Sequence, residues 1–311
     1  MSRGEREGHS PDALRWATDA HYEDAERYDR TYHRRRHDVA FYREMAAEHG
    51  GPVLELGVGT GRVALAIARD GHEVVGVERM PTMLERLRAR LRKEPAAVRD
   101  RITLVRGDIR KFAIASSSPS SAKRGRVGTV PSHASSPSPA RRGRVGEGRH
   151  ASSEPRRFPL VIAPFNVLMH LYSRADLEMM LACVRAHLRP RGVFVLDVRM
   201  PDIRSFTRDP MRPYRCPRLK DRDGTLYDTA ELFQYDAGTQ VQMITSTYRE
   251  VAEPHRTFVR PLAHRQFFPQ ELELLLHYNG LEIRERWGDF ERGAMDVDCE
   301  SQVLVTGLRR R

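Results

Sequence analysis

The residues best suited to hold a ligand lie in Val53–Ala68, VLELGVGTGRVALAIA, where three glycines follow an acidic residue. In a dinucleotide-binding fold, the third glycine of G-x-G-x-x-G allows the following helix to pack closely. Here Arg62 occupies that position, and the glycines are bunched as G-x-G-x-G over residues 57–61. The carboxylate of Glu55 would repel a pyrophosphate, but it could help to hold an ammonium group. The segment therefore favours a ligand that carries positive charge.

Two more acidic residues lie at the ends of predicted strands. Glu78 ends the strand EVVGVE, where an acidic side chain can accept hydrogen bonds from both ribose hydroxyls. Asp108 follows a third strand and is placed to meet an adenine amino group. Its alternative role is to cap its own loop. Ribose recognition alone would fit an adenine dinucleotide equally well.

The elements that would position these residues alternate between strand and helix. Near-continuous apolar strands joined by amphipathic helices predict a parallel sheet covered on both faces, a doubly wound α/β fold. The predicted strands are Val53–Leu56, Glu73–Glu78, Ile102–Val105, Leu160–Pro164 and Val193–Val198, and the predicted helices are Arg62–Asp70, Pro81–Lys93 and Asp176–Leu188.

The pattern changes after Met200. Alternating residues with turn signals between them predict a three-stranded antiparallel addition over Tyr227–Tyr235, Val241–Val251 and Thr257–Phe267. A helix, Pro269–Asn279, and two closing strands, Leu281–Trp287 and Gln302–Leu308, then follow. The predicted core is thus a Rossmann-like sheet of seven strands, five parallel plus a closing antiparallel hairpin. The predicted division is 1–45 N-terminal lid helices, 46–200 cofactor-binding core, 201–268 antiparallel β substrate cap, and 269–311 closing helix and hairpin.

A Ser/Pro/Arg-rich segment, residues 114–157, interrupts the core. It contains nine basic and two acidic residues, so it carries most of the net charge of +11. It has almost no large apolar residues, and it repeats RGRVG and HASS. Such a composition cannot offset the entropy of ordering, and it predicts a long disordered loop. The alternative is an RNA- or anion-binding arm.

Other features exclude some classes of protein. No apolar run is long enough to cross a membrane, and the first residues are charged and polar, which predicts a cytoplasmic protein. The cysteines at positions 183, 216 and 299 have no C-x-x-C spacing, so neither a disulfide framework nor a structural zinc site is expected. No compact cluster of oxygen ligands suggests a metal.

Taken together, E-L-G-x-G-T-G-R, the acid ending strand two, G-D after strand three and APFNVLMHL at strand four resemble a class I S-adenosylmethionine-dependent methyltransferase. The resemblance covers roughly Tyr28–Arg199 without the insert, plus the closing hairpin. It is closest to small-molecule enzymes that begin with YDxxY, here residues 28–32. One departure is Pro159, where such proteins usually have an aspartate.

The resemblance implies S-adenosyl-L-methionine as the cofactor and assigns roles by position. Its methionine part would be lined by the glycine loop, its ribose by Glu78, its adenine by Asp108, and its sulfonium end by the segment after strand four. The cofactor-binding residues so expected are Glu55, Gly57, Gly59, Gly61, Glu78, Arg79, Asp108, Ile109 and Asn166.

Methyl transfer from a sulfonium mainly requires alignment of the nucleophile and exclusion of water, and a base only if the acceptor must lose a proton. The candidate catalytic residues are Tyr28 and Tyr32, near the methyl group, and His170 as a general base. Each could instead be a packing residue. One arginine of residues 34–36 is a candidate partner for the cofactor carboxylate, and Asp197 a candidate for orienting the substrate.

The predicted function is metal-independent transfer of a methyl group to oxygen or nitrogen of a small molecule, by a monomer or homodimer. A nucleic-acid base is disfavoured because residues 163–166 do not match the N/D-P-P-Y/F motif. The alternatives are an RNA or protein methyltransferase recruited by the Arg-rich insert, and a catalytically silent nucleotide-binding protein. An NAD-dependent dehydrogenase is opposed by Arg62 and Glu55.

Overall fold

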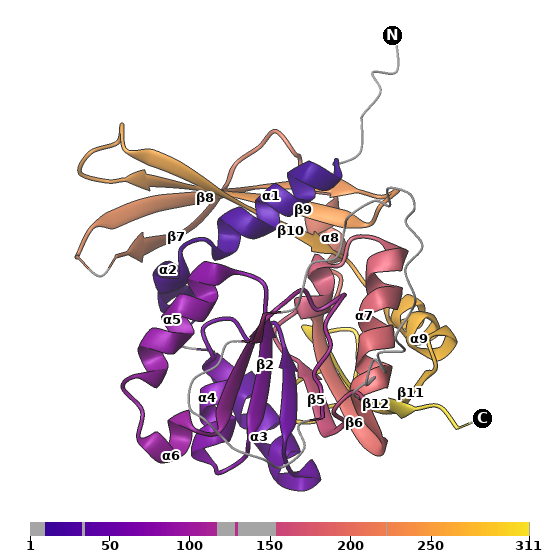
Figure 1. Cartoon of the computed structure of the whole chain (residues 1–311). Coiled ribbons are helices and arrows are strands. Elements are labelled where there is room, and N and C mark those ends of the chain that lie inside the picture. The colour runs from indigo at the N-terminus through magenta and orange to yellow at the C-terminus, as the bar shows by residue number, and fades with distance from the viewer. Residues whose placement is uncertain (1–9, 33–34, 117–127, 130–153, 222, 311) are drawn as a thin grey trace, which may run out of the picture.

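Two β-sheets organise the chain in the computed structural model, which describes residues 10–32, 35–116, 128–129, 154–221 and 223–310 (Figure 1). The larger sheet has eight strands and the smaller has four. The smaller sheet lies over one end of the larger one, beyond the ends of its central strands (Figure 1).

The larger sheet has the strand order β11-β12-β6-β5-β1-β2-β3-β4. Strands β1 to β6 are parallel to their neighbours, β12 is antiparallel to β6, and β11 is antiparallel to β12. The predicted fold class is therefore confirmed, with a two-residue strand, β4, added at one edge. The strands are β1 (Val53–Leu56), β2 (Val74–Glu78), β3 (Ile102–Arg106), β4 (Gly128–Thr129), β5 (Phe158–Ala163), β6 (Leu188–Arg199), β11 (Leu281–Trp287) and β12 (Ser301–Leu308).

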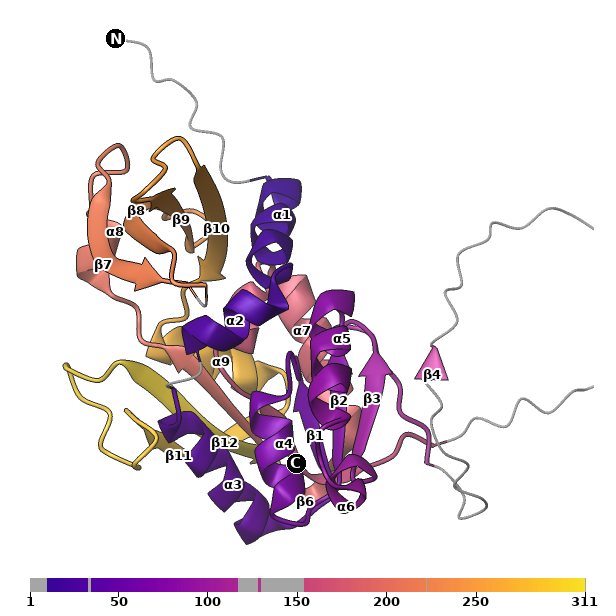
Figure 2. The same ribbon diagram turned by 90° about the vertical axis from the view of Figure 1, so that its left-hand side faces the viewer.

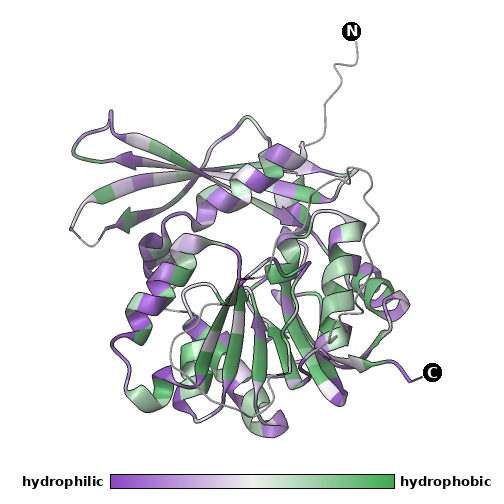
Figure 3. Cartoon of the chain, in the orientation of Figure 1, coloured by the Kyte–Doolittle hydropathy of each residue, from purple (hydrophilic) through white to green (hydrophobic). Residues whose placement is uncertain are grey.

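Helices cover both faces of this sheet. Successive residues of β1 face opposite sides, so Val53 packs in one apolar cluster with α3 and α4, while Leu54 packs in the other with α7 and α9. The strands are apolar through the centre, and polar residues lie on the outer helices (Figure 3). The helices are α3 (His37–His49), α4 (Arg62–Arg69), α5 (Pro81–Leu91), α6 (Ala96–Arg99), α7 (Arg174–His187) and α9 (Pro269–Tyr278).

The smaller sheet, called here the cap sheet, has the order β10-β9-β8-β7. The sequence predicted three of its strands and missed β7. Pro217 lies within β7, where the register with β8 shifts between Cys216 and Leu219. A proline without an N–H is tolerated at such an edge, but it removes the sequence signal for a strand. The strands are β7 (Tyr214–Lys220), β8 (Leu226–Asp236), β9 (Val241–Glu250) and β10 (Thr257–Arg265), preceded by the short helix α8 (Ile203–Phe206).

Two N-terminal helices join the cap sheet to the core. Helix α1 (Pro11–Tyr22) lies across the cap sheet, and α2 (Ala25–Tyr32) follows it toward α5 (Figures 1 and 2). Leu14 and Ala17 of α1 pack in an apolar cluster with Val241, Met243 and Ala263 of the cap sheet.

The segment predicted to be disordered, residues 114–157, lies mostly outside the described residues. Its two ends pair with each other: the N–H of Ser116 donates to the Glu154 carbonyl at 3.1 Å, and that of Arg156 to the Ile114 carbonyl at 2.7 Å. Within the segment, β4 pairs with the edge of β3 (Figure 2). Among the described helices, none is long and apolar enough to cross a membrane.

Candidate active site

The glycine loop after β1 adopts a conformation that requires glycine. Gly57 has φ +69° and Gly61 has φ +78°, in the left-handed region that other residues rarely adopt. A Cβ on Gly57 would lie 2.8 Å from Cγ2 of Val167, and one on Gly61 would lie 2.3 Å from Cδ1 of Leu87. The loop can therefore approach the segment after β5 and the helix α5 only because these residues lack side chains.

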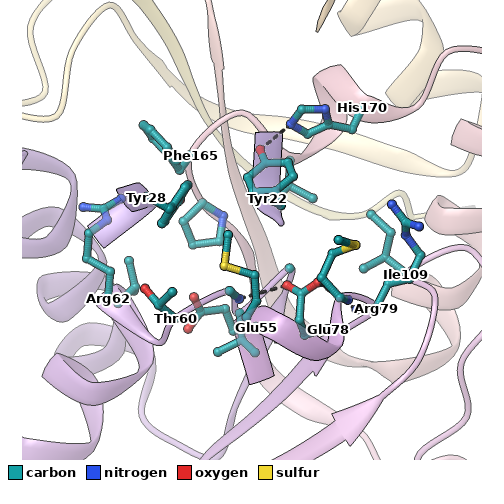
Figure 4. A pocket seen from close by; sticks show the side chains of 18 of the residues that line it. Tyr22, Tyr28, Glu55, Thr60, Arg62, Glu78, Arg79, Ile109, Phe165 and His170 are labelled. Carbon is teal, nitrogen blue, oxygen red and sulfur yellow. Dashed lines mark hydrogen bonds between the residues drawn. The ribbon is translucent and has the colours of Figure 1, made fainter. Parts of the chain in front are cut away.

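Glu78 fixes this loop to the end of β2. Its Oε2 accepts a 2.9 Å hydrogen bond from the N–H of Gly59, and its Oε1 accepts bonds of 2.8 Å from the N–H groups of Arg79 and Met80. Burial raises the pKa of Glu78, and the three N–H groups partly oppose that rise. The side chain nevertheless lines a cavity (Figure 4), and each of its oxygens can accept more than one hydrogen bond.

Glu55 lies buried at the floor of the same cavity. Its Oε2 has no hydrogen-bond partner among the described residues. Burial raises the pKa of Glu55 well above its ordinary value, and the charge of Arg62 opposes the rise. Arg62 also lines the cavity and is held by Asp38 through bonds of 2.7 and 2.5 Å. Sequence reasoning considered Arg62 only as a substitute for a glycine and missed this position.

Asp108 and Ile109 also line this cavity. Asp108 also caps its own turn, because its Oδ1 accepts a 2.9 Å bond from the N–H of Arg110, whose guanidinium lies 2.6 Å from Oδ2. Burial works against ionisation, but Arg110 outweighs it and lowers the pKa of Asp108. Asp108 therefore caps its own loop, as one of the two interpretations of the sequence expected, and it also lines the cavity.

This smaller cavity has a volume of about 130 Å³. It brings together most of the site residues expected from the sequence, and Figure 4 shows the acidic floor below the aromatic side chains. The expected residues that line it are Tyr28, Glu55, Gly57, Gly59, Glu78, Arg79, Asp108, Ile109 and His170.

A second cavity of about 820 Å³ lies between the cap sheet and the ends of β5 and β6. Tyr32 and Asn166 line this larger cavity, and Gly61 lines neither. Tyr28 and Phe165 line both cavities. The two spaces therefore meet at these two rings, which we call the junction.

The backbone at the junction is strained. Phe165 has φ 63° and Asn166 has φ 62°, and a left-handed conformation costs a residue such as Phe about 1–3 kcal/mol. The buried carboxylate of Asp197 accepts bonds of 2.7 Å from the N–H of Phe165 and 3.2 Å from that of Asn166. It also accepts a 2.7 Å bond from the hydroxyl of Tyr42. Asp197 lines neither cavity, so the expectation that it orients a substrate is corrected: it holds the loop after β5.

His170 has a partner that the sequence did not suggest. The hydroxyl of Tyr22, at the end of α1, lies 2.6 Å from Nε2 of His170 (Figure 4). Burial, together with the charges of His21 and Arg79, lowers the pKa of His170 to about 3. The imidazole is therefore neutral at physiological pH and is a weak base. Tyr22 belongs to no recognisable sequence motif. It reaches the cavity because α1 packs on the cap sheet.

Aromatic residues of α1 and α2 form the wall beside the junction. The rings of Tyr28 and Tyr32 lie 4.8 Å apart, and that of Tyr32 lies 4.8 Å from Phe165. The hydroxyl of Tyr32 lies 3.2 Å from Nε2 of His21. Burial raises the pKa of Tyr32 to about 12 and lowers that of His21 to about 4.

The YDxxY segment is anchored by its aspartate. Asp29 accepts a 2.6 Å bond from the hydroxyl of Thr60 in the glycine loop, and its other oxygen lies 2.7 Å from Nε of Arg86 on α5. These bonds fix α2 so that Tyr28 faces the smaller cavity.

One arginine of residues 34–36 was expected to pair with the cofactor carboxylate, and the two that the structure describes lie in different places. Arg34 lies outside the described residues. Arg35 lines the larger cavity and lies 3.4 Å from Asp38, and Arg36 lines neither cavity. Within the described ranges, no group of three or more His, Cys, Asp or Glu side chains could hold a metal ion.

A family model and several solved structures are similar to this chain, and all of them are methyltransferases, in line with the resemblance in the sequence. Residues 53–120 match a family model described as a methyltransferase domain. That match covers the glycine loop, the acidic end of β2 and the turn at Asp108. No curated protein matched the chain.

Solved structures of methyltransferases match nearly the whole chain. The CcbJ methyltransferase from Streptomyces caelestis is 24% identical, with a TM-score of 0.66 over 94% of this chain and 99% of that one. An S-adenosylmethionine-dependent methyltransferase from Clostridium acetobutylicum is 14% identical, with a TM-score of 0.64 over 93% and 98%. CalS10 from Micromonospora echinaspora, an amino pentose methyltransferase with bound S-adenosylmethionine, is 18% identical, with a TM-score of 0.55 over 98% and 99%. At these identities the similarity establishes the fold.

Proposed function

We propose that the protein transfers a methyl group from S-adenosylmethionine to a small molecule, without a metal, and that nitrogen rather than oxygen accepts it. The observation that carries the proposal is the pair of cavities that meet at Tyr28 and Phe165. The smaller cavity would hold the cofactor and the larger one the acceptor. The cap sheet and helices α1 and α2 would then act as the substrate cap and the lid.

The residues of the smaller cavity fit this cofactor. The unpaired Oε2 of Glu55 is a buried acceptor suited to the ammonium group of the methionine part. Glu78 offers carboxylate lone pairs to ribose hydroxyls, and Gly57 and Gly59 line the cavity without side chains. Asp108 and Ile109 would meet the adenine. Arg62 would replace the arginines of residues 34–36 as the partner of the cofactor carboxylate.

When bound, S-adenosylmethionine supplies an electrophilic methyl group on a sulfonium. The protein has to align the acceptor with it and exclude water. Tyr28, Tyr32 and Phe165 would exclude water at the junction. Asp197 and Tyr42 would hold the strained backbone of Phe165 and Asn166 in place. Phe165 would then already be in position at the junction before the ligands bind.

The protonation states beside the junction favour nitrogen. An efficient general base has a pKa near the working pH. Burial lowers the pKa of His170 to about 3 and of His21 to about 4, and it lowers that of His264 well below its ordinary value. Burial raises the pKa values of Tyr22 and Tyr28. An unprotonated amine attacks with its own lone pair, whereas an alcohol would need one of these groups as a base.

Methyl transfer from radiolabelled S-adenosylmethionine tests the proposal. Paired acceptors that differ only in an amine or a hydroxyl should give product with the amine alone, and S-adenosylhomocysteine should form in equal amount. Transfer to the hydroxyl members would shift the proposal to oxygen. No turnover with any acceptor, despite binding of both sulfur compounds, would favour a catalytically silent binding protein.

A further inference from the structure

The cap sheet presents an aromatic platform to the larger cavity. Tyr248 of β9 is directly opposite Phe258 of β10, and their rings are stacked with centroids 5.0 Å apart and planes at 10°. Arg260 lies two residues after Phe258 on the same strand, so both side chains lie on the same face of the sheet. Tyr248 and Arg260 line the larger cavity.

Two guanidinium groups converge on this platform from different elements. Arg27 of α2 lies 4.0 Å from the ring centre of Tyr248 and 4.4 Å from that of Phe258. Arg260 of β10 lies 5.2 Å from the ring centre of Phe258. Both are half-buried and line the larger cavity. Neither forms a salt bridge with any carboxylate in the described part of the chain.

The acidic residues that line the larger cavity are fewer than its arginines, so they do not cancel the positive charge of Arg27 and Arg260. The larger cavity is lined by the arginines Arg27, Arg35, Arg199, Arg208, Arg215 and Arg260 and by the acids Asp24, Asp202, Glu231 and Glu300.

The nearby acids have partners of their own. Asp24 caps α2 by accepting a 2.9 Å bond from the backbone N–H of Arg27, and Asp202 caps α8. Glu231 accepts a 3.1 Å bond from the hydroxyl of Ser246. Burial lowers the pKa of Arg27 and the charge of Arg260 adds to that shift, while Tyr248 and Asp24 only partly oppose it. The two cations, which both line the larger cavity, thus repel each other.

We propose that the methyl acceptor carries an anionic group, a carboxylate or a phosphate, that binds between Arg27 and Arg260. This inference rests on the proposed function, because it assigns the larger cavity to the acceptor. A planar guanidinium can bond either group through two parallel N–H donors. Stacking on Tyr248 and Phe258 holds the two guanidinium groups in place before the anion binds, which reduces the entropy lost on binding. The anion would also relieve the repulsion between the two arginines.

Binding of two simple anions to the full-length protein saturated with S-adenosylhomocysteine tests this site. Inorganic pyrophosphate represents the phosphates and citrate the carboxylates, and calorimetry gives the dissociation constant of each. At least one of them should bind the wild type in the millimolar range or tighter. Arg27→Gln and Arg260→Gln should each weaken that binding by tenfold or more. The anion that binds more tightly identifies the group that the acceptor carries.

Two further arginines provide matched controls. Arg249 follows Tyr248 on β9, lies outside both cavities and pairs with Asp228, so Arg249→Gln should leave anion binding unchanged. Arg208 lines the same cavity but stacks on Tyr214 of β7 and Phe233 of β8, toward the other edge of the cap sheet. A loss in Arg208→Gln with retention in Arg27→Gln and Arg260→Gln would overturn the proposed position.

The same experiment separates this inference from the proposed function. All the variants should bind S-adenosylhomocysteine as the wild type does. If they do, but neither anion binds, or both bind all variants equally, the anion site is wrong and the cofactor assignment stands. If the wild type does not bind S-adenosylhomocysteine, the proposed function itself fails.

Discussion

The hydroxyl of Tyr22 lies 2.6 Å from Nε2 of His170, so a helix near the N-terminus is hydrogen-bonded to the loop after β5. This contact joins α1, which packs on the cap sheet, to the wall of the smaller cavity. It closes the cavity on the side away from the glycine loop (Figure 4). His170 is thereby better suited to position Tyr22 than to remove a proton.

Substitution of His170 distinguishes these two roles. We expect His170→Gln to lower kcat by no more than about tenfold, because a neutral hydrogen bond contributes about 0.5–1.5 kcal/mol. Loss of a general base would cost about 10²–10⁴-fold. Tyr22→Phe should cause a similar small loss. The pH profile of kcat/KM should follow the pKa of the acceptor amine in all three proteins, and a limb that disappears only in His170→Gln would show that His170 is the base.

Asp197 should be essential to the loop that carries Phe165. In Asp197→Asn the amide NH₂ would replace one of the two carboxylate oxygens and would face the N–H of Asn166 or that of Phe165, which then loses its acceptor. Hydrogen bonds to charged groups contribute about 1.5–3 kcal/mol each. The free energy of unfolding should fall by at least that amount, and kcat should fall with it. Tyr42→Phe is the control, because it removes one bond to Asp197 at a cost of about 1 kcal/mol and leaves the loop held. Equal stability of Asp197→Asn and wild type in urea unfolding would refute this assignment.

Glu55 gives cofactor binding a pH dependence of known sign. Burial raises the pKa of Glu55 well above its ordinary value in the free protein. An ammonium beside Oε2 would favour the carboxylate, so binding would lower that pKa and release a proton. Affinity for S-adenosylhomocysteine should therefore rise with pH until the pKa of the free protein is passed, and it should fall again above about pH 8, where an α-amino group loses its charge. Calorimetry in buffers of different ionisation enthalpy would detect the proton release.

The matched variant Glu55→Gln should lose the rising limb and bind about 10–100-fold more weakly, as expected for a lost charge-assisted bond. An unchanged pH profile in this variant would place the ammonium group elsewhere.

The sequence predicted the core of the fold closely because its signals were local. Buried strands such as β1 read as apolar runs, and Gly57 to Gly61 marked the turn that follows. It could not predict the contacts made between distant elements. Tyr22 lies beside His170 because α1 packs on the cap sheet, and Asp197 holds the loop after β5 because its carboxylate is buried beneath that loop. Strand β7 was missed because Pro217 removes the signal for an edge strand.

The residues between the paired ends of the insert should be dispensable for a small acceptor. The N–H of Ser116 already bonds the carbonyl of Glu154, so a short Gly/Ser turn can replace residues 117–153. Because closure entropy changes slowly with loop length, turnover should stay within about twofold of the wild type. If this segment recruits the enzyme to RNA, its replacement would instead weaken RNA binding and reduce the salt dependence of that binding, as a filter-binding titration would show.

The central claim is that the smaller cavity holds S-adenosylmethionine, and thermal unfolding tests it most directly. The protein would be heated with S-adenosylmethionine, S-adenosylhomocysteine, NADH or no ligand, beside Glu78→Ala and the control Glu73→Ala, which lies just before the opposite end of β2. A ligand at about a hundred times its dissociation constant stabilises a fold by roughly 2.7 kcal/mol. Both sulfur compounds should raise the Tm of the wild type and of Glu73→Ala, and neither should raise that of Glu78→Ala. A shift with NADH alone would contradict the account and identify the glycine loop as a dinucleotide site.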